Sequence, residues 1–462
     1  MYPCYSTDNT TNKIKIHLIS PDSFNMWHTH QNSQIQSWLN ANNYQGLENT
    51  YLVIPSNTGN ITEVVVSTVN PNMNYFGDLA IKLPQGIYEL VGVEQAVYQQ
   101  AALSWGMGAY QFTKYKEGKN YPAQLFLPEA TDPVKIQHLL EGIYLVRDLI
   151  NTPCEDMSPA HLADETKRLA KQFGAKYSDI VGDKLLSKNF PAIHAVGRAS
   201  HIEPRLIELN WGDDKHPHII LVGKGVCFDT GGYDLKSSGG MRYMKKDMGG
   251  AAHVLGLAKI IMAQQLPIRL TVLISAVENV VSGNAYKPGD VVKTRKGITV
   301  EIGNTDAEGR VVLSDALAYA AEKNPELIID FATLTGAARV AVGTEISAMF
   351  SNKDEIAQTL QQTSFDNYDP IWQLPLYKPY RDLINSPIAD ICNNASQPYA
   401  GAITAGLFLQ EFVNDLPWVH FDLMAWNVSS KPAHPEGGEA MAVRAVFEWL
   451  TGAYHNPGES AE

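Results

Sequence analysis

The sequence predicts an α/β protein of two domains, in which a larger C-terminal domain contains a mixed, largely parallel sheet covered by helices. Its 462 residues exceed the length of one ordinary domain. Continuous apolar runs alternate with helical segments along the second half of the chain, as in strands that are buried on both faces of a sheet. The apolar and charged fractions, 45% and 18%, are those of an ordinary globular protein.

The first 131 residues are expected to form a smaller N-terminal α/β domain. Short β-type runs, among them "KIKIHLI" and "EVVVSTV", alternate there with helical segments. Residues 132–153 are then predicted to form one helix, because apolar residues recur at helical spacing up to an Asn-Thr-Pro exit. Proline disfavours helix in the residue before it, so this helix is expected to end there and to link the two domains.

Residues 154–462 are expected to form the larger domain. Residues 249–265 are predicted to form a helix. The predicted buried strands are "HIILVG" (218–223), "RLTVLISAV" (269–277), "LIIDFATL" (327–334) and "WVHFDLMAW" (418–426). In sheets of this kind, ligands bind beyond the carboxyl ends of the strands. The residues that follow these strands are therefore the first candidates for a functional site.

Charge, cysteine content and hydropathy exclude several classes of protein. The net charge of −13 and the pI near 5.5 argue against non-specific nucleic-acid binding, which depends on basic patches. Four dispersed cysteines without a CxxC pair favour a reduced, cytoplasmic protein. The first residues lack the pattern of a signal peptide, and no apolar run approaches the ~20 residues of a membrane helix, so no membrane association is expected.

Four carboxylates and two lysines are expected to gather where the predicted strands end. From the glycine-rich segment after "HIILVG", which contains seven glycines, two acids and two lysines are candidates, and the turn "NTDAEGR" (304–310) supplies two more acids. The six residues are Lys224, Asp229, Lys236, Asp247, Asp306 and Glu308. Taken singly, Asp247 could be a helix cap and Asp229 a turn residue, and His253 is expected to be a packing residue.

Two divalent cations would explain why so many carboxylates lie together. Clustered carboxylates cannot all stay ionised without positive charge among them. Two metal ions about 3.5–4 Å apart, bridged by one or two carboxylates, would supply that charge. Carboxylate-rich shells suit Mn, Mg or Zn, and the glycines would allow the backbone to approach ions and substrate closely.

The motifs "VGKGVCFDTGG", "KKDMGGAA", "NTDAEGR" and "DFATLTGA" resemble those of the leucyl aminopeptidase (M17) family, which includes the cytosolic aminopeptidases A and B. The similarity extends from about residue 143 to about residue 450. It implies a metal-dependent aminopeptidase, a hydrolase that removes the N-terminal residue of peptides, with residues 154–462 as its catalytic domain. It also implies two Mn or Zn ions per chain, a homohexamer and a cytoplasmic location.

The resemblance implies that five residues hold the two metal ions. Asp229 and Glu308 would bridge the ions. Lys224, as a neutral amine, and Asp247 would complete one metal site, and Asp306 would complete the other. A desolvated position next to two cations would favour the neutral form of the lysine.

By the same resemblance, two further charged residues act on the substrate. Lys236 would stay protonated and stabilise the oxyanion that forms when a hydroxide bridging the metals attacks the scissile carbonyl. Arg310 would remain free of the metals and would hold a bicarbonate ion that relays the proton.

The first residue of the substrate peptide is expected to bind beside the metals. By resemblance, Met244, Thr333 and Gly336 line the pocket for its side chain. The backbone of Leu334 would hold its amine. A wall that contains methionine favours leucine, methionine or another apolar residue.

Other interpretations stay open at this point. Asp234 departs from the family pattern and adds an acid two residues before Lys236, with an effect that the sequence does not decide. A two-metal phosphoesterase would tend to have histidine-rich ligands, which this cluster lacks. A non-catalytic DNA-binding or scaffold member of the family is the main alternative, and the acidic net charge and the filled ligand positions argue against it.

Overall fold

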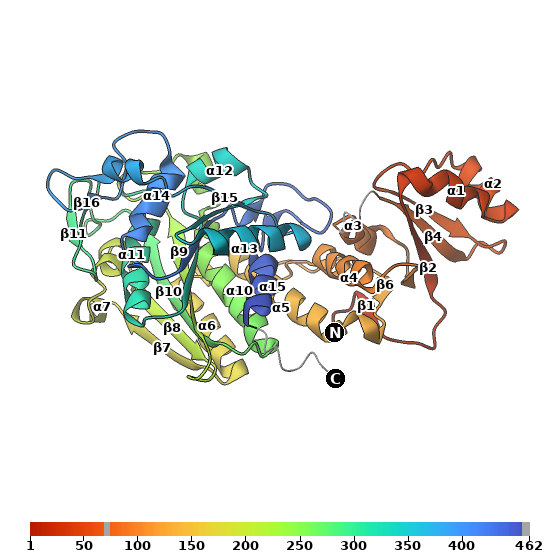
Figure 1. Cartoon of the computed structure of the whole chain (residues 1–462), viewed down its shortest axis with the longest axis horizontal. Helices are drawn as coiled ribbons and strands as arrows, with labels where there is room; N and C mark the ends of the chain where they lie inside the picture. The colour runs from red at the N-terminus through yellow and green to blue at the C-terminus, as the bar shows by residue number, and fades with distance from the viewer. Residues whose placement is uncertain (69–73, 455–462) are drawn as a thin grey trace. The chain divides into compact units, whose positions relative to one another are not determined.

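The computed structural model describes residues 1–68 and 74–454 (Figure 1). The chain divides into two compact units. The first comprises Met1–Leu140 and Val428–Glu436, and the second comprises Glu141–Asn427 and Gly437–Glu462. The helix expected over residues 132–153 is α5 (Pro133–Asn151). The division into domains at 1–131 and 154–462 stays a prediction.

The first unit contains a six-stranded sheet with the strand order β1-β6-β5-β2-β4-β3. β3, at one edge, pairs antiparallel with β4, and the other neighbours pair parallel. Its strands are β1 (Tyr5–Ser6), β2 (Ile14–Ile19), β3 (Thr50–Pro55), β4 (Ile61–Ser67), β5 (Gly86–Val91) and β6 (Ala123–Phe126), and its helices include α1 (Phe24–Thr29), α2 (Ser33–Ala41), α3 (Tyr75–Lys82) and α4 (Gln95–Ala109). The apolar residues that predicted strands, such as Ile16 and Val64, are fully buried.

The second unit contains an eight-stranded sheet with the order β15-β14-β17-β13-β9-β10-β8-β7. The four central strands, β17, β13, β9 and β10, run parallel, whereas β8, β7 and β14 introduce antiparallel pairs. The strands are β7 (Lys176–Val181), β8 (Arg205–Trp211), β9 (His218–Asp229), β10 (Arg269–Asn279), β13 (Leu327–Ala332), β14 (Ser347–Ser351), β15 (Ile371–Gln373) and β17 (Trp418–Asp422). This is the mixed, largely parallel sheet that the apolar runs predicted.

Helices and small sheets complete the second unit. The helices are α6 (Pro159–Phe173), α7 (Lys184–Ser187), α8 (Pro191–Gly197), α9 (Ser238–Met241), α10 (Gly249–Ala263), α11 (Glu308–Glu322), α12 (Gly336–Val342), α13 (Asp354–Asp366), α14 (Gly401–Gln410) and α15 (Val443–Tyr454), with a short 3-10 helix η4 (Met244–Met248). β11 (Val291–Lys293), β12 (Thr299–Glu301) and β16 (Ile391–Cys392) form a separate sheet. Among the described helices, none combines the length and apolar character that crossing a membrane requires.

Different helices cover the two faces of the eight-stranded sheet (Figure 1). Gly223 of β9 faces α10, because a Cβ atom there would lie 2.7 Å from the Cα atom of Ala251. Ile220 and Val222 point to the opposite face and join a core cluster with residues of α8, α11 and α14. Both faces of the parallel centre are therefore buried, which confirms the predicted fold class.

All four predicted strands differ in length from those observed: β10 is two residues longer and β13 two residues shorter, and the other two differ more. β9 continues to Asp229 instead of ending at residue 223, because β10 pairs with it as far as Asn279. Lys224 therefore lies within a strand and not beyond its end. The strand predicted over 418–426 ends at Asp422, and Ala425, with φ 55°, interrupts it before β18 (Trp426–Asn427).

Candidate metal centre

The candidate site lies where β9 ends and α11 begins, with η4 beside β9. β9 supplies a lysine and an aspartate, η4 supplies a second aspartate, and the other two acids stand at the start of α11. These residues are Lys224, Asp229, Asp247, Asp306 and Glu308. Contacts among their side chains show that the fold brings the five predicted metal ligands together.

Lys224 is a buried cation in contact with two carboxylates. Its Nζ lies 2.7 Å from Oδ2 of Asp247 and 2.9 Å from Oε1 of Glu308, and it donates to the carbonyl oxygen of Thr333 at 3.0 Å. Although burial favours the neutral amine, the charges of Asp247 and Glu308 raise the pKa of Lys224. Gly309 leaves room for this side chain, because a Cβ atom there would lie 2.7 Å from Cε of Lys224.

Lys236 is the second cation of the cluster and contacts the other two carboxylates. Its Nζ lies 2.8 Å from Oδ2 of Asp229 and also contacts Oδ1 of Asp306. Burial opposes the charged form, but the charge of Asp229 and the hydrogen bonds to both acids raise the pKa of Lys236. Two ammonium groups thus face four carboxylates, so the cluster keeps a formal excess of negative charge.

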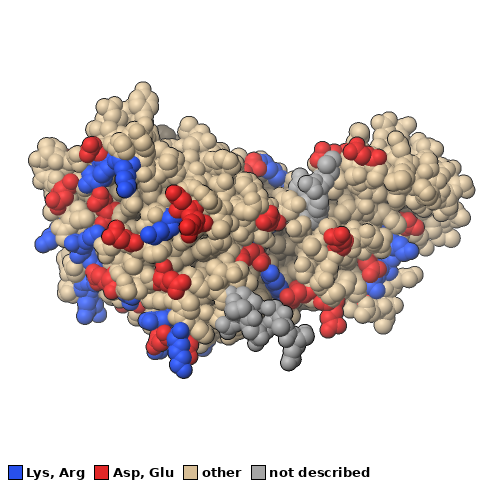
Figure 2. All heavy atoms as spheres, viewed as in Figure 1, with Lys and Arg blue, Asp and Glu red and all other residues tan. Residues whose placement is uncertain are grey.

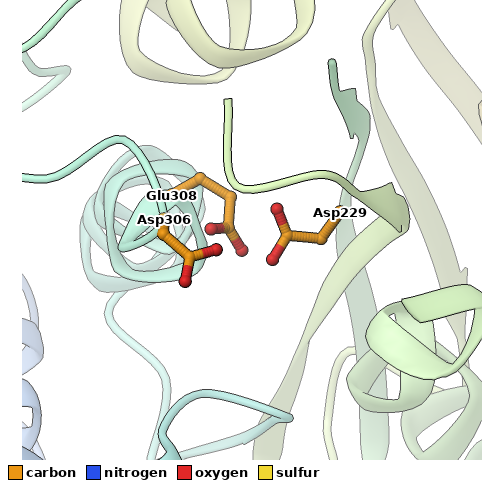
Figure 3. Close-up of side chains that lie close together, drawn as sticks. All are labelled: Asp229, Asp306 and Glu308. Atoms are coloured by element: carbon orange, nitrogen blue, oxygen red, sulfur yellow. The ribbon is translucent and has the colours of Figure 1, made fainter. Parts of the chain in front are cut away.

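Three of the carboxylates meet closely enough to share a metal ion. Oxygen atoms of Asp229, Asp306 and Glu308 lie within 4.8 Å of one another. Figure 3 shows the three side chains pointing toward one another, Asp229 from the end of β9 and the other two from the start of α11. This spacing of oxygen ligands suits divalent cations.

Burial and mutual repulsion raise the pKa of two of these carboxyl groups. Burial, followed by the charge of Asp229, raises the pKa of Glu308 to about 8. Burial, followed by the charge of Asp247, raises the pKa of Asp229 to about 6. Burial also acts to raise the pKa of Asp247, but the charges of Lys224 and Lys246 lower it. A cation among these groups would favour their ionised forms.

One buried carboxylate oxygen of the site, Oε2 of Glu308, has no hydrogen-bond donor among the residues that the structure describes. Oδ2 of Asp247, by contrast, lies 2.7 Å from Nζ of Lys224. A buried charged oxygen without a donor is costly, and a divalent cation would satisfy it. The donor set therefore fits a metal centre.

The turn before α11 is held by Asp234, whose effect the sequence did not decide. Oδ2 of Asp234 accepts a hydrogen bond from the backbone N of Thr305 at 2.7 Å, and the backbone N of Asp234 donates to the Thr305 hydroxyl at 2.9 Å. That hydroxyl donates to the carbonyl oxygen of Gly231 at 2.6 Å. Gly231 has φ 88°, a conformation that side chains disfavour. These hydrogen bonds connect the loop that contains Lys236 to the turn that contains Asp306.

Asn279 and Tyr286 support the site but were not predicted. Nδ2 of Asn279 donates to Oδ1 of Asp229 at 2.8 Å and to the carbonyl oxygen of Thr305 at 3.0 Å. Oη of Tyr286 donates to the same carbonyl oxygen at 2.7 Å. Asn279 ends β10 beside Asp229, so a search for polar residues at strand ends would have found it. Tyr286 lies in the loop that follows, where no pattern marks it.

Arg310, predicted to bind an anion, lies buried in the first turn of α11. Within the described part of the chain, its Nε has no hydrogen-bond partner. Burial lowers the pKa of Arg310 to about 10, and the charge of Asp422 opposes this effect. A buried guanidinium group with an unpartnered donor fits a small anion such as bicarbonate.

Thr333 and Leu334, predicted to bind substrate, lie next to buried acids. The hydroxyl of Thr333 donates to Oδ1 of Asp247 at 2.8 Å. The backbone N of Leu334 donates to Oδ1 of Asp422 at 2.9 Å. A substrate amine is itself a donor, so it would use the carbonyl group of Leu334 and not this N–H group.

Met244 and Gly336, the other two predicted substrate residues, lie on separate elements. Met244 is half-buried and begins η4, which also carries Asp247. Gly336 is the exposed first residue of α12.

His253 is confirmed as a packing residue. Its Nδ1 lies 2.6 Å from the carbonyl oxygen of Gly249, and its Nε2 accepts from the backbone N of Met441 at 2.9 Å. The ring stacks on Phe331 within the core. Both ring nitrogens are therefore used within the fold, which requires the neutral tautomer with the proton on Nδ1.

Two family models match the chain. The model of the cytosol aminopeptidase family catalytic domain, Peptidase M17, matches residues 144–447, and the model of the M17 aminopeptidase N-terminal domain matches residues 14–128. Among named relatives, the chain is 38% identical over 381 residues to a probable cytosol aminopeptidase of Clostridium perfringens, covering 78% of this chain and 76% of the relative. It is 40% identical over 370 residues to one of Roseiflexus castenholzii, covering 76% of each.

Solved structures agree with these matches. The cytosol aminopeptidase from Coxiella burnetii is 50% identical, with a TM-score of 0.95 over 98% of this chain and 100% of that chain. The bottromycin maturation enzyme BotP in complex with Mn is 30% identical, with a TM-score of 0.85 over 96% of this chain and 100% of that chain. The chain described here therefore belongs to the M17 cytosol aminopeptidase family and is an aminopeptidase, a hydrolase of peptides.

Proposed function

We propose that this aminopeptidase depends on two divalent ions, Mn or Zn, and that it releases apolar N-terminal residues such as leucine or methionine from peptides. The observation that carries the proposal is the space shared by Asp229, Asp306 and Glu308, whose oxygen atoms lie within 4.8 Å of one another. The similar enzyme BotP was solved in complex with Mn, which supports a divalent ion in this site.

Five side chains would hold the ions. Asp229 and Glu308 would lie between them, Lys224 and Asp247 would complete one site, and Asp306 would complete the other. The contacts of Lys224 with Asp247 and Glu308 support this grouping. Lys224 would bind as a neutral amine, because a nearby cation favours loss of its proton. When bound, the ions supply polarisation of the scissile carbonyl and activation of the attacking water.

Lys236 would stabilise the negative charge that develops on the carbonyl oxygen of the substrate. Its contacts with Asp229 and Asp306 keep the ammonium group charged. Its side chain is 16% exposed, so a bound peptide could reach it. A cation that is positioned before the reaction stabilises a developing oxyanion without reorganisation.

Arg310 would hold a bicarbonate ion. Every acid of the cluster is assigned to a metal ion, so none is left to accept the proton of the attacking water. The buried guanidinium group of Arg310, with its unpartnered Nε, stands in the first turn of a long helix, where anions are favoured. A bicarbonate ion held there would act as the base.

The substrate would be a peptide whose first residue binds beside the metals. The carbonyl group of Leu334 would accept from its α-amine, and Met244, Thr333 and Gly336 would line the pocket for its side chain. Assembly into a homohexamer, a cytoplasmic location and the division into domains 1–131, linking helix 132–153 and catalytic domain 154–462 complete the proposal. These features are supported by the family match.

DNA binding is a weaker alternative for this chain. The net charge is −13, and on the face of the second unit shown in Figure 2 Lys and Arg side chains lie beside Asp and Glu side chains. Binding to DNA through its phosphates requires a surface with an excess of positive charge.

Hydrolysis of a leucine anilide tests the proposed function. The purified protein is stripped with a chelator and then assayed with Mn or Zn added back, beside Asp306→Ala. Asp366→Ala, at the exposed end of α13, is the matched control for loss of one acid. We expect activity that requires the metal, survives in Asp366→Ala and is lost in Asp306→Ala.

The opposite results would overturn the proposal in different ways. Turnover that persists after chelation would exclude metal dependence. A folded protein that binds two ions and hydrolyses no leucyl, methionyl or other peptide substrate would favour a scaffold role. Full activity in Asp306→Ala would remove this carboxylate from the metal site.

A further inference from the structure

Asp422 is a buried acid that the mechanism proposed above does not use. It ends β17, and its relative exposure is 2%. Its Oδ1 accepts hydrogen bonds from the backbone N atoms of Leu334 and Thr335 at 2.9 and 3.1 Å. Its Oδ2 accepts from the Thr335 hydroxyl at 2.6 Å. One carboxylate thus accepts from two consecutive peptide groups of the segment that joins β13 to α12.

The pairing of β17 with β13 brings Asp422 to this segment. Asp422 lies opposite Ala332, the last residue of β13, in the register of the two parallel strands. The Thr335 hydroxyl, which donates to Asp422, also accepts from the backbone N of Ala338 at 3.0 Å and so caps the start of α12. Asp422 therefore holds the three residues between β13 and α12 in a defined conformation.

The first residue of this segment, Thr333, contacts both side chains that would complete one metal site. Its carbonyl oxygen accepts from Nζ of Lys224 at 3.0 Å, and its hydroxyl donates to Oδ1 of Asp247 at 2.8 Å. An amine that binds a cation through its lone pair still donates through its N–H groups. The carbonyl oxygen of Thr333 is an uncharged acceptor for one of them, and partners of this kind orient metal ligands.

The geometry of the peptide groups links Asp422 to these contacts. Both peptides are trans, so the N–H and C=O groups of each point to opposite sides. The peptide between Thr333 and Leu334 directs its N–H group to Asp422 and its carbonyl group to Lys224. The next peptide directs the N–H group of Thr335 to Asp422, so the carbonyl group of Leu334 faces away from this acid.

The carbonyl oxygen of Leu334 is available to a ligand. Within residues 1–68 and 74–454, it accepts no hydrogen bond. It is the group proposed above to accept from the α-amine of the substrate. The two carbonyl groups that Asp422 orients would therefore serve different partners, one a metal ligand and the other the substrate.

We propose that Asp422 is a positioning residue of the reaction, which directs the carbonyl group of Thr333 to Lys224 and that of Leu334 to the substrate amine. One carboxylate outside the ligand set would thus place a metal ligand and the substrate relative to each other. The proposal rests on the metal-dependent activity proposed above and deepens it by adding a residue that touches neither the ions nor the peptide.

Calorimetric Mn titration of the metal-free protein and kinetics on a leucyl anilide test this role in Asp422→Ala. Mn affinity at one of the two sites should fall by about 10-fold or more, as for other losses of a partner of a metal ligand. At saturating Mn, KM should rise by about 10-fold, the value of one hydrogen bond to a charged group. Asp369→Ala is the matched control, because Asp369 is a buried acid that accepts from backbone N–H groups at the start of α15.

Asp422→Asn separates hydrogen bonding from charge. It keeps an acceptor oxygen for the two N–H groups, so Mn affinity and KM should stay within about threefold of wild type. The charge of Asp422, which also acts on Arg310, is lost in Asp422→Asn as it is in Asp422→Ala. The two variants therefore differ only in whether the peptide groups keep their acceptor.

Thr335→Val tests the same contact without removing the buried acid, and it decides the question if Asp422→Ala does not fold. Valine cannot donate to Oδ2 of Asp422, so the carboxylate loses one of its three donors. Mn affinity should fall by about threefold or more, a fraction of the value of one hydrogen bond. Thr335→Ser keeps the hydroxyl and should restore the wild-type affinity.

Three outcomes would overturn the proposal. An Asp422→Ala protein that melts at a lower temperature but keeps wild-type Mn affinity and KM, as Asp369→Ala should, would make Asp422 a purely structural acid. Equal losses in Asp422→Asn and Asp422→Ala would assign the effect to charge and not to the oriented peptides. Wild-type Mn affinity in folded Thr335→Val would show that this contact does not position the site. A wild type that binds Mn without turnover would instead contradict the proposed function, and the Mn titrations would still test Asp422.

Discussion

Two buried acids of the second unit differ in how their oxygens are satisfied. Asp369 accepts hydrogen bonds from the backbone N atoms of Ala442, Arg444 and Ala445 at 2.9, 2.9 and 3.2 Å. Glu308 is buried as deeply, but one of its oxygens contacts a lysine and the other has no donor among the described residues. Backbone N–H groups at the start of α15 donate to both carboxylate oxygens of Asp369. One oxygen of Glu308, in contrast, receives no hydrogen bond from the described residues.

This difference separates an acid that stabilises the fold from one that is held for a ligand. Amide donors at a helix start stabilise a carboxylate, and the guanidinium group of Arg444 adds to them here, because its Nε lies 3.9 Å from Oδ2 of Asp369. A buried carboxylate that lacks donors raises the free energy of the folded chain until a cation binds. The two acids should therefore respond in opposite ways when they are replaced, and the following experiments test how far this contrast holds.

Replacement of Glu308 should cause the largest change in activity. Glu308→Gln keeps the shape of the side chain but removes the charge of a proposed bridging ligand. Loss of a residue that only supports a metal ligand lowers metal affinity or activity by about 10- to 100-fold. Loss of a ligand itself should therefore lower kcat/KM for a leucyl anilide by at least about 100-fold. The Tm of the metal-free protein should stay close to that of wild type near pH 7, because burial raises the pKa of Glu308 to about 8 and its carboxyl group is largely protonated when no cation is bound.

Steady-state kinetics at saturating Mn and calorimetry of the metal-free protein check both parts. A metal-free Glu308→Gln protein that melts more than about 5 °C below wild type would contradict the distinction between Glu308 and Asp369. Such a loss would make Glu308 a structural acid as well.

Replacement of Asp369 should lower stability and spare activity. Asp369→Ala leaves three buried backbone N–H groups at the start of α15 without an acceptor, so the free energy of unfolding should fall by about 3 kcal/mol. Urea denaturation measures this loss. Asp369→Asn, which keeps one acceptor oxygen, should lose less. A drop in kcat/KM per folded molecule comparable to that of Glu308→Gln would refute the distinction.

His253 is a buried base that differs from Glu308, because both of its ring nitrogens have hydrogen-bond partners. Burial lowers the pKa of His253 to about 4, whereas an unfolded histidine titrates near 6.5. Below pH 6.5 the unfolded chain therefore binds a proton that the folded chain excludes, so stability is lost as the pH falls from 6.5 toward 4. Between pH 6.5 and 5 this single group should remove about 2 kcal/mol.

Urea denaturation of wild type and His253→Gln across this pH range isolates the effect. The glutamine variant should be less stable at pH 7 but should lose less stability on acidification. Parallel curves for the two proteins would show that His253 does not titrate as the structure implies.

Asp234 should give the smallest effect, because this acid is exposed although it is hydrogen-bonded to the site. Asp234→Ala removes the acceptor for the backbone N of Thr305 and loosens the turn that carries Asp306. The expected loss in kcat/KM is about 3- to 10-fold, the value of one hydrogen bond. Asp213→Ala, an exposed acid in the loop after β8, is the control. Calorimetric Mn titration should show weaker binding in Asp234→Ala only, and unchanged Mn affinity would argue that Asp234 does not position the ligands.

Local patterns were enough to predict where most of the site's acids and lysines lie. Asp306 and Glu308 stand between a β-type run and an amphipathic helix, and parallel sheets place such turns at one edge. The same reasoning placed Lys224 beyond a strand end, which was wrong. β9 continues through this lysine because β10 pairs with it for the same length, and the length of a pairing partner is not visible in the strand itself.

Partners supplied by distant segments were not predicted. Asn279 and Tyr286 reach Asp229 and Thr305 only through the register of β9 with β10 and the path of the following loop. Asp422 reaches the backbone of Leu334 because β17 pairs with β13. None of these contacts follows a period of 2 or 3.6 residues, so no local pattern reveals them.

The sequence by itself determined the α/β class, the parallel centre of the larger sheet and the family to which the chain belongs. Apolar periodicity and motif spacing are local properties, and burial acts on them in the same way wherever the segment lies. Only the tertiary structure decided which polar atoms are satisfied. It paired Lys224 with Asp247 and Glu308 and bonded Asp234 to Thr305. Hydrogen bonds and ion pairs act over a few ångströms, so they depend on how distant segments pack together.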